Sequence, residues 1–399
     1  MDGYLVVLNA GSSSLKFCIY GTAGDLWQLE ARGQVEGIGT SPRFSVKDGT
    51  GKPVGEQRVD REVHDADSAL GFVATWFRTR FPAAELTGVG HRVVHGGVKY
   101  TAPAIVTPEV LEDLRRLVPL APLHQPYNLA AIEAVNERLP GVPQVACFDT
   151  SFHRGQPVVA EVVPLPHEIR ERGVQRYGFH GLSYEYIASV LPRVAPEIAG
   201  GRVVVAHLGS GASLCALRDR KSIDSTLGFT ALDGLCMGTR PGSLDPGIVL
   251  YLFQDLGLTP KQVETMLYKQ SGLIALSGIS NDMRDLLRES TKPAAKLAID
   301  YFVYRAVKEI GALSAALGGI DGLVFTAGIG ENSAEVRLRI VEGCRWLGVE
   351  LDADANQANQ TRISVAGSRV SAWVIPTNEE LIIARRMGQL LGLVEARSA

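Results

Sequence analysis

Two turns rich in glycine and serine, each placed between apolar strands, constrain this chain most strongly. The first follows an apolar run at residues 4–8 and spans residues 9–14, and the second follows residues 203–206 and spans residues 207–213. Backbone N–H groups approach phosphate oxygens only where no Cβ intrudes, and hydroxyl groups add further donors. Either turn alone would also suit an ordinary β-hairpin. Their repetition indicates a duplicated fold that holds a phosphate between its halves.

Length and composition favour a globular protein of two or three domains. The chain has 399 residues, of which 46% are hydrophobic and 21% are charged, so it can bury a sizeable core and is not a disordered protein. Its net charge is −3, from 40 basic and 43 acidic residues. A surface that binds nucleic acid usually has a basic excess, so we expect no nucleic-acid partner.

The cysteines and the N-terminal residues favour a soluble, cytoplasmic protein. The 5 cysteines are odd in number and form no CxxC pair, which is typical of reduced, buried thiols. Residues 1–3 lack the basic region and the long apolar stretch of a signal peptide. No segment approaches the ~18 apolar residues of a membrane helix, so we expect no membrane partner.

Strand-like and helix-like segments alternate, which is typical of the α/β class. Helices are predicted to begin at Thr107-Pro108 and Thr259-Pro260, where a hydroxyl precedes a proline. A long amphipathic helix is predicted from Pro293 to Leu317. The buried strand at 322–326 is expected to break into a glycine turn at 327–332, before a helix that Ser333 caps, and Asn378 is expected to cap a last helix.

Residues 48–52 contain a Gly-Lys pair but do not form a Walker motif. No glycine precedes Gly51 by five residues, and Pro53 stands where a Ser or Thr would be needed. A hairpin tip is the better interpretation.

Three segments place charged side chains beside glycines, namely residues 88–97, 176–181 and 237–242. Arg92, His180 and Arg240 in these segments could be held in a cleft, or the arginines could form surface ion pairs. Such a set suits phosphoryl transfer, which mainly requires positioning and neutralisation of the moving group. Histidine ligation of a metal is disfavoured, because His91 and His95 lie in a strand-like stretch.

Two carboxylates have both a functional and a local structural interpretation. Asp149 ends an apolar strand, where it could orient an arginine or contact metal-bound water, or simply cap a turn. Glu379 begins the last helix, where it could hold Mg²⁺ or simply favour the helix dipole; position alone favours the dipole.

The whole chain resembles the acetokinase family, which belongs to the actin, hexokinase and Hsp70 fold superfamily. The matching segments keep the family's order and together are far more specific than a generic nucleotide loop. They are residues 9–16, 90–97, 121–124, 148–150, 177–181, 207–209, 237–240, 282–284, 325–332 and 376–380.

The resemblance implies two duplicated RNase H-like (actin-like ATPase) α/β domains with an active-site cleft between them. The expected N-terminal domain comprises residues 1–150 plus 385–399, and the expected C-terminal, nucleotide-binding domain comprises residues 151–384. The family also forms homodimers, so a homodimer is expected here.

The resemblance further implies reversible phosphoryl transfer from ATP to acetate, giving acetyl phosphate and ADP by direct in-line transfer. Mg²⁺, which Mn²⁺ can replace, would be the cofactor. A carboxylate nucleophile is ionised at pH 7 and needs no general base. The site must instead overcome the repulsion between two anions, which two arginines and a metal can do.

The resemblance assigns catalytic roles to Asp149, His180 and Arg240. Arg240 would share the charge of the transferring phosphoryl group, and His180 would donate a hydrogen bond to that group. Asp149 would hold Arg92 or Arg240 in place, or assist the metal shell. Arg92 would bind the carboxylate of the acid. The pocket for the acid would comprise Arg92, Val94, Leu123, Phe179 and Ala231.

The resemblance also implies a metal site and a nucleotide site. Asn9 and Glu379 would position Mg²⁺, mainly through water. The residues expected to bind ATP are Ser12, Ser14, Lys16, His207, Leu208, Gly209, Ser210, Gly211, Asp282, Met283, Arg284, Gly328, Ile329, Gly330, Glu331 and Asn332.

The chain departs from the family's usual pattern in four places. Where Ser210 stands the family usually has Asn, and where Ala231 stands it usually has Pro. Leu182-Ser183-Tyr184 replaces Thr-Ser-His, and Pro241-Gly242-Ser243 replaces Ser-Gly-Asp. Because Ala231 is smaller than Pro, a propionate or other short-chain carboxylate kinase is an alternative, since one methylene is worth only ~1–3 kcal/mol of discrimination.

A non-enzymatic ATP-switch protein of the same superfamily is a second alternative. Such a protein would reuse the two phosphate loops. It would not need Arg92, His180 and Arg240 together, so their joint presence favours an enzyme.

Overall fold

The computed structural model describes residues 3–22, 27–59 and 63–393. It contains two compact units: unit 1 runs to Phe152 and resumes at Asn378, and unit 2 runs from His153 to Thr377. The last helix therefore lies in unit 1 from its first residue. The predicted domain boundaries at 150/151 and 384/385 stay a prediction, and residues 394–399 of the predicted first domain lie outside the described residues.

Unit 1 contains one mixed sheet. Its strands are β1 (Gly3–Ala10), β2 (Ser14–Gly21), β3 (Gln28–Glu36), β4 (Arg43–Asp48), β5 (Pro53–Arg58), β6 (Glu85–Val93), β7 (Ala104–Ile105) and β8 (Gln144–Phe148). They lie in the order β5-β4-β3-β2-β1-β6-β8-β7. The strands from β5 to β1 pair antiparallel, whereas β1, β6 and β8 run parallel. The carboxyl ends of β1, β6 and β8 therefore meet at one edge of the sheet.

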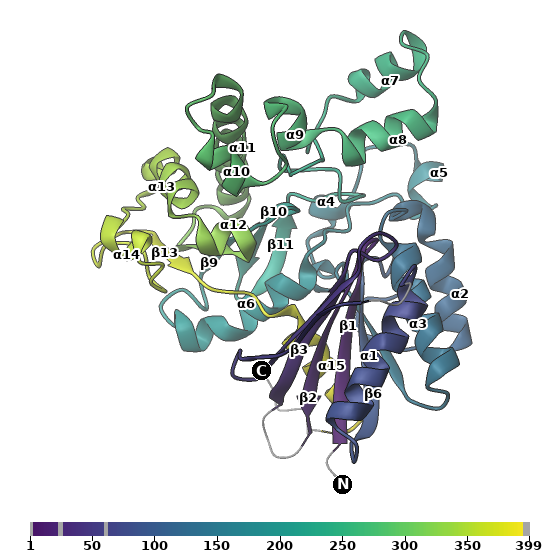
Figure 1. Cartoon of the computed structure of the whole chain (residues 1–399). Coiled ribbons are helices and arrows are strands. Elements are labelled where there is room, and N and C mark those ends of the chain that lie inside the picture. Colours follow the sequence, from purple (N-terminus) through teal and green to yellow (C-terminus); the bar gives the residue numbers. More distant parts are fainter. Residues whose placement is uncertain (1–2, 23–26, 60–62, 394–399) are drawn as a thin grey trace. The chain divides into compact units, whose positions relative to one another are not determined.

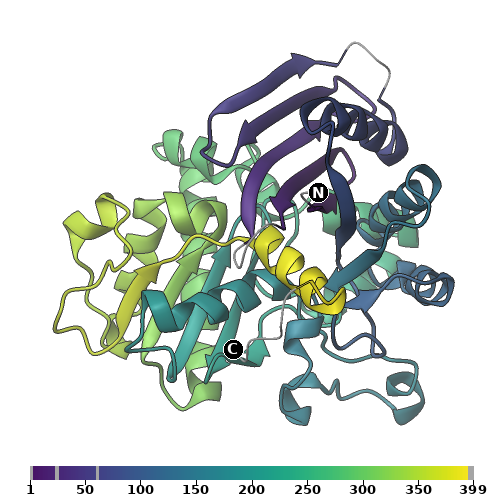
Figure 2. The same cartoon turned by 90° about the horizontal axis from the view of Figure 1, so that it is seen from below.

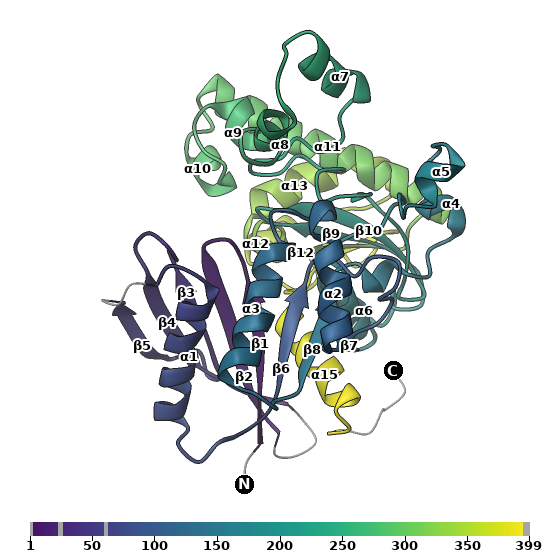
Figure 3. The same ribbon diagram turned by 90° about the vertical axis from the view of Figure 1, so that its right-hand side faces the viewer.

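Helices cover both faces of this sheet. They are α1 (Ala66–Arg80), α2 (Pro108–Arg116), α3 (Gln125–Arg138) and α15 (Glu379–Leu390). Helices α1 and α3 lie over one face (Figure 3), where they bury Val6, Leu8 and Val89 of the parallel strands. Alternate residues of a strand point to opposite faces. Helix α15, yellow in Figure 2, packs on β1, β6 and β8 from the other face.

Gly90 shows why β6 contains glycine at alternate positions. A Cβ built on Gly90 would lie 2.7 Å from Cγ2 of Ile383 and 3.4 Å from Cε of Met387, both on α15. Any side chain here would push the helix off the sheet. The glycines of this segment thus provide close packing for α15 in addition to flanking Arg92.

Unit 2 contains a second, smaller sheet with helices around it (Figure 1). Its strands are β9 (Arg202–Leu208), β10 (Ala212–Arg218), β11 (Lys221–Ser225), β12 (Gly322–Thr326) and β13 (Ser371–Val374). Its helices are α4 (Val158–Glu161), α5 (His167–Arg170), α6 (Gly181–Val194), α7 (Pro246–Gln254), α8 (Pro260–Lys269), α9 (Gly272–Ser277), α10 (Met283–Arg288), α11 (Pro293–Leu317), α12 (Ala327–Asn332), α13 (Ala334–Gly343) and α14 (Ala353–Gln357).

The two sheets share one core topology. In unit 1 the order β3-β2-β1-β6-β8 has two antiparallel pairings followed by two parallel ones. In unit 2 the order β11-β10-β9-β12-β13 repeats that pattern strand for strand. This confirms the predicted duplicated α/β fold. Strands β4, β5 and β7 are additions to the first copy.

Most of the predicted local elements are confirmed. Pro108, Pro260 and Pro293 are the first residues of α2, α8 and α11, and Gly318 ends α11 with a φ of +71°. Residues 48–52 form the tip of the β4–β5 hairpin. One prediction is wrong in detail, because residues 327–332 form the short helix α12 instead of an open glycine turn.

The state of the cysteines agrees with the reduced, buried thiols that the sequence predicts. All 5 cysteines are free and buried. Within residues 3–22, 27–59 and 63–393, no helix combines the length and apolar character needed to span a membrane.

Candidate active site

Polar residues meet at the carboxyl ends of the parallel strands of unit 1. The register pairs Leu8 with His91 and Val93 with Phe148. Asn9 and Arg92 therefore lie next to each other on adjacent strands, and Asp149 follows directly after β8. Ligands of α/β sheets usually bind at this end of the strands.

Arg92 and Asp149 form a two-pronged ion pair. Nε of Arg92 donates to Oδ1 of Asp149 at 3.0 Å, and Nη2 donates to Oδ2 at 2.7 Å. The remaining nitrogen, Nη1, lies 3.5 Å from Oδ1 of Asn9. Asp149 is only 2% exposed, whereas Arg92 is 22% exposed. The carboxylate thus fixes the guanidinium, and part of the guanidinium still faces open space.

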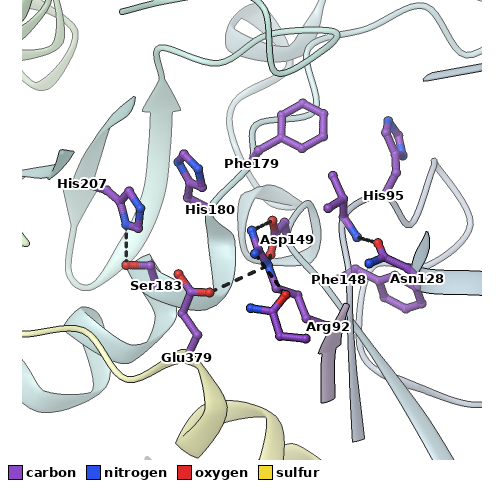
Figure 4. A network of polar contacts seen from close by, with 12 residues as sticks. Arg92, His95, Asn128, Phe148, Asp149, Phe179, His180, Ser183, His207 and Glu379 are labelled. Carbon is purple, nitrogen blue, oxygen red and sulfur yellow. Dashed lines mark hydrogen bonds and ion pairs between the residues drawn. The ribbon is translucent and has the colours of Figure 1, made fainter. Parts of the chain in front are cut away.

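Glu379 brings a second carboxylate to Arg92 from the start of α15. Asn378 caps this helix, since its Oδ1 accepts from the N–H of Leu381 at 3.0 Å. Oε2 of Glu379 lies 3.7 Å from Nε of Arg92, and Figure 4 shows Arg92, Asp149 and Glu379 turned toward one another. Burial raises the pKa of Glu379 to about 7, with a further contribution from the Asp149 charge. Two carboxylates beside one arginine leave this cluster short of positive charge.

The structure also explains how Arg92 stays charged. Burial alone would lower its pKa, but the charges of Asp149 and Glu379 together raise the pKa of Arg92 above the ordinary value. Arg92 is therefore a permanent cation that can bind an anion.

Asn128, on α3, was not predicted from the sequence. Its Oδ1 accepts from the backbone N–H of Val94, and its Nδ2 donates to the carbonyl of Ala10, each at 3.0 Å. Asn128 thereby ties the residue after Asn9 to the segment that follows Arg92 (Figure 4). Among the predicted pocket residues of unit 1, Val94 is buried and Leu123 is half-buried. An asparagine inside a helix gave no sequence signal that pointed to this role.

The first glycine-serine turn lies at the same end of the sheet. The β1–β2 register places Lys16 opposite Asn9, and Lys16 is exposed. Ser12 is exposed and Ser14 is half-buried. Their hydroxyl groups and the Lys16 ammonium can therefore reach an anion at this turn.

His180 is held in a strained backbone conformation in unit 2. Its φ is +57°, in the left-handed region that residues other than glycine rarely adopt, and it precedes α6. Its ring stacks on His207 with the centroids 4.2 Å apart (Figure 4). Its Nδ1 lies 2.8 Å from Oγ of Ser213, on β10. The phenyl ring of Phe179, the preceding residue, is buried.

Arg240 lies beside His180 and has an unusual environment. Its Nη1 donates to the carbonyl of Ala231 at 2.7 Å. Across residues 3–22, 27–59 and 63–393 it forms no ion pair with a carboxylate, and burial lowers its pKa. A Cβ built on Gly211 would lie 3.1 Å from Nη2 of Arg240 and 3.3 Å from Nε2 of His180. The absence of a side chain at Gly211 thus keeps a space open beside both donors.

The second glycine-serine turn is fixed by backbone hydrogen bonds. The N–H of Gly209 donates to the carbonyl of Gly211 at 3.0 Å, and the N–H of Gly238 donates to the carbonyl of Ser210 at 3.1 Å. Nδ1 of His207 lies 2.8 Å from Oγ of Ser183. Leu208 is fully buried in β9.

A cavity of about 460 Å³ lies next to this turn. Eight of the predicted nucleotide-binding residues line it, and sequence reasoning missed three further lining residues, Asn281, Leu287 and Ser333. The predicted eight are Gly209, Ser210, Asp282, Met283, Arg284, Gly328, Ile329 and Asn332. Its lining is mixed apolar and polar, which suits a nucleoside.

Two predicted nucleotide-binding residues have structural roles next to the cavity. Gly330 is buried inside α12. Oε1 of Glu331 accepts from the N–H of Ala327 at 2.8 Å and from the N–H of Thr377 at 3.1 Å. Ala327 has a φ of +65°, and Glu331 therefore holds a strained turn at the cavity wall.

In the part of the chain that the structure describes, no group of three or more His, Cys, Asp or Glu side chains could hold a metal ion. The oxygens of Asn9 and Glu379 are a sparser donor set, of the kind that Mg²⁺ accepts when water and phosphate complete its shell.

Comparisons with known proteins agree over the whole chain. The model of the acetokinase family matches residues 4–385. An acetate kinase from Rhizobium meliloti is 52% identical over 400 residues, covering 100% of both chains, and one from Nitrobacter hamburgensis is 51% identical over 393 residues, covering 98% of this chain and 96% of the relative.

Solved structures give the same result. A crystal structure of a propionate kinase from Francisella tularensis has a TM-score of 0.88 at 34% identity and covers 96% of this chain and 98% of its own. The acetate kinase of Porphyromonas gingivalis has a TM-score of 0.84 at 34% identity and covers 97% of this chain and 100% of its own.

Proposed function

This chain belongs to the acetokinase family, and from that premise we propose that it transfers a phosphoryl group reversibly from ATP to acetate, giving acetyl phosphate and ADP. The nucleophile would be the carboxylate of the acid, which is already ionised at neutral pH. The catalytic requirement is then to position two anions and to neutralise the charge that passes between them.

We assign the binding of the acid to unit 1. Arg92 would bind the carboxylate with the part of its guanidinium that Asp149 leaves uncovered. The two bonds from Asp149 support this role, because they fix the orientation of the guanidinium before the acid arrives. Within unit 1, Val94 and Leu123 would contact the methyl group, and Phe179 and Ala231 are the pocket residues proposed for unit 2.

We assign charge stabilisation and nucleotide binding to unit 2. Arg240 would share the developing charge of the phosphoryl group, and Nε2 of His180 would donate a hydrogen bond to it. The turn at 207–211 would hold the phosphates, and the 460 Å³ cavity would hold the adenosine. Within unit 1, Ser12, Ser14 and Lys16 are proposed as donors to phosphate oxygens at the first glycine-serine turn.

Asn9 and Glu379 would hold Mg²⁺, and Mn²⁺ could replace it. The raised pKa of the Glu379 carboxyl group, which burial causes and the Asp149 charge increases, supports this assignment, because a bound cation would favour the ionised form. When bound, the cation would neutralise charge on the nucleotide phosphates. A homodimer and a cytoplasmic location complete the proposal on the grounds of family and composition.

Arg240 provides the observation that carries the proposal. The half-buried guanidinium of Arg240 has no carboxylate partner in the described residues, and burial disfavours its charge, so an anion that binds there would be favoured. Arg240 lies next to His180 and to the glycine-serine turn at 207–211. We therefore infer that the anion that binds Arg240 is a phosphoryl group.

The test is the hydroxamate assay, which traps acyl phosphates, with MgATP and with acetate, propionate or butyrate. We expect the highest kcat/KM for acetate, and we expect Arg240→Ala to abolish turnover while the circular dichroism spectrum stays unchanged. Near-normal turnover of Arg240→Ala would exclude its role. If no acid yields an acyl phosphate in folded protein that binds ATP, a non-enzymatic ATP switch becomes the better interpretation.

Preference for propionate is the second candidate. Ala231 stands where the family usually has proline, and a propionate kinase is among the similar structures. One methylene contributes only about 1–3 kcal/mol to discrimination, so the two acids can compete closely. A higher kcat/KM for propionate in the same assay would establish this candidate.

A further inference from the structure

Tyr184 lies behind His180 and departs from the family's usual histidine. It is on α6 and is fully buried. Its hydroxyl oxygen lies 2.5 Å from Oγ of Ser213, and Ser213, also fully buried, lies 2.8 Å from Nδ1 of His180. A chain of hydrogen bonds therefore runs from a tyrosine, through a serine, to the histidine placed beside Arg240.

The direction of these bonds follows from counting protons. Burial raises the pKa of Tyr184 well above its ordinary value, so its hydroxyl group keeps its proton. Within residues 3–22, 27–59 and 63–393, the hydroxyl group of Tyr184 has Ser213 as its one hydrogen-bond partner. A buried O–H without an acceptor is costly, so Tyr184 donates to Ser213.

Ser213 must then direct its own proton to His180. A serine hydroxyl has one proton to donate and can accept two hydrogen bonds. Tyr184 occupies one acceptor site, and Nδ1 of His180, 2.8 Å away, is the other hydrogen-bond partner of the buried Ser213 side chain among the described residues, so Ser213 donates its proton to Nδ1. Nδ1 is thereby an acceptor, and the proton of the neutral imidazole must be on Nε2.

We propose that Tyr184 is a positioning residue that, through Ser213, keeps the proton of His180 on Nε2. That nitrogen is the one beside Gly211 and Arg240, since a Cβ on Gly211 would lie 3.3 Å from it. The ring is thus oriented to donate a hydrogen bond into the space that Gly211 leaves open. The use of this donor in turnover rests on the proposed function, whereas the position of the proton does not.

A purely structural role for Tyr184 makes a different prediction. Its ring contacts His153 and His207 edge-on, with centroids 5.7 Å and 6.3 Å away. Tyr184→Phe retains these ring contacts and removes only the hydroxyl group. Both acceptor sites of Ser213 are then open and its hydroxyl group is no longer polarised by a donor, so the tautomer with the proton on Nδ1 becomes more accessible than in the wild type.

The decisive test is ¹⁵N NMR of the histidine-labelled protein at about pH 8, where an ordinary imidazole is neutral. His180→Gln identifies the resonances of His180. We expect an unprotonated Nδ1 and a protonated Nε2 in the wild type, and a shift toward protonated Nδ1 in Tyr184→Phe. A wild-type proton on Nδ1, or an unchanged spectrum in Tyr184→Phe, overturns the proposal whether or not the protein is a kinase.

Kinetics test whether the position of the proton matters for turnover. Tyr184→Phe should lower kcat by about three- to tenfold, as expected for a lost hydrogen bond, and leave both KM values within about twofold. Ser213→Ala should give a similar loss, and the double variant should be no worse than Ser213→Ala alone, because both act on one proton.

The matched control is Tyr100→Phe, which removes another partly buried hydroxyl group, bonded to Oδ2 of Asp113 in unit 1 at 2.7 Å. It should leave kcat unchanged. A kcat for Tyr184→Phe equal to that of Tyr100→Phe would overturn the positioning role.

Discussion

Replacement of Asp149 by asparagine tests the acid-binding half of the site, because it keeps the shape of the side chain and removes its charge. In the wild type, Arg92 donates to both carboxylate oxygens, at 3.0 Å and 2.7 Å. An asparagine offers one acceptor oxygen, and its amide N–H groups face the other guanidinium nitrogen. The variant therefore loses at least one charge-assisted hydrogen bond and the fixed orientation of Arg92.

The size of the loss can be worked out from these contacts. A hydrogen bond to a charged group contributes about 1.5–3 kcal/mol. Breaking a fully buried ion pair costs about 3–5 kcal/mol, which overestimates the loss in this variant. The reason is that Arg92 keeps the Glu379 carboxylate at 3.7 Å and is 22% exposed, so its charge is still compensated. At 1.4 kcal/mol per factor of ten, the expected loss is about 10- to 150-fold in kcat/KM for acetate.

The hydroxamate assay measures kcat/KM for acetate when acetate is varied at saturating MgATP. A second series with varied ATP gives KM for ATP. KM for ATP should stay within about twofold, because the contacts of Asp149 are to Arg92. The control is Asp113→Asn, which alters an exposed pair, Lys99 Nζ to Asp113 Oδ2 at 2.6 Å, in the same unit. Exposed pairs contribute only about 0–1 kcal/mol to stability, and turnover should not change. A kcat/KM for acetate within threefold of wild type in Asp149→Asn would falsify the reasoning.

Three further substitutions test other parts of the structure. Gly211→Ala should lower kcat at least about tenfold in the same assay with an unchanged circular dichroism spectrum, because its Cβ would lie 3.1 Å from Nη2 of Arg240 and 3.3 Å from Nε2 of His180. Ala231→Pro should lower the ratio of propionate to acetate kcat/KM by up to about tenfold, and an unchanged ratio would contradict a role in the pocket. Burial lowers the pKa of His91 from 6.5 to about 4. Between these values only the unfolded chain binds the proton, so the free energy of unfolding falls on acidification by up to about 1.4 kcal/mol per pH unit. His91→Gln should reduce that slope in urea unfolding at two pH values in this window, and an equal slope in both proteins would contradict the assignment.

The elements that could be predicted are those whose signals are local. Proline and glycine mark both ends of α11, and apolar runs beside a glycine-serine turn identify both hairpins. The short helix α12 could not be predicted in this way. Its first N–H, from Ala327, is capped by the carboxylate of Glu331, and the same carboxylate also holds Thr377, 46 residues away.

In the candidate site, too, contacts between residues far apart in the sequence could not be predicted. The sequence left open whether Asp149 pairs with Arg92, Arg240 or the metal shell, and the parallel register of β6 and β8 is what puts it against Arg92. Asn128 and Tyr184 act through partners 34 and 29 residues distant, Val94 and Ser213. Such pairs depend on how strands and helices pack, which no local pattern encodes.

The position of α15 has a consequence for how the chain is made. This helix packs on β1, β6 and β8, yet all of unit 2 is synthesised before it. A nascent chain that has emerged only as far as Thr377 therefore lacks the helix that covers one face of its first sheet, and it also lacks Glu379. Gly88 and Gly90 contribute no side chains to shield that face. Unit 1 can complete its packing only after residues 379–390 have been synthesised, so a nascent chain without them cannot have all the residues around Arg92.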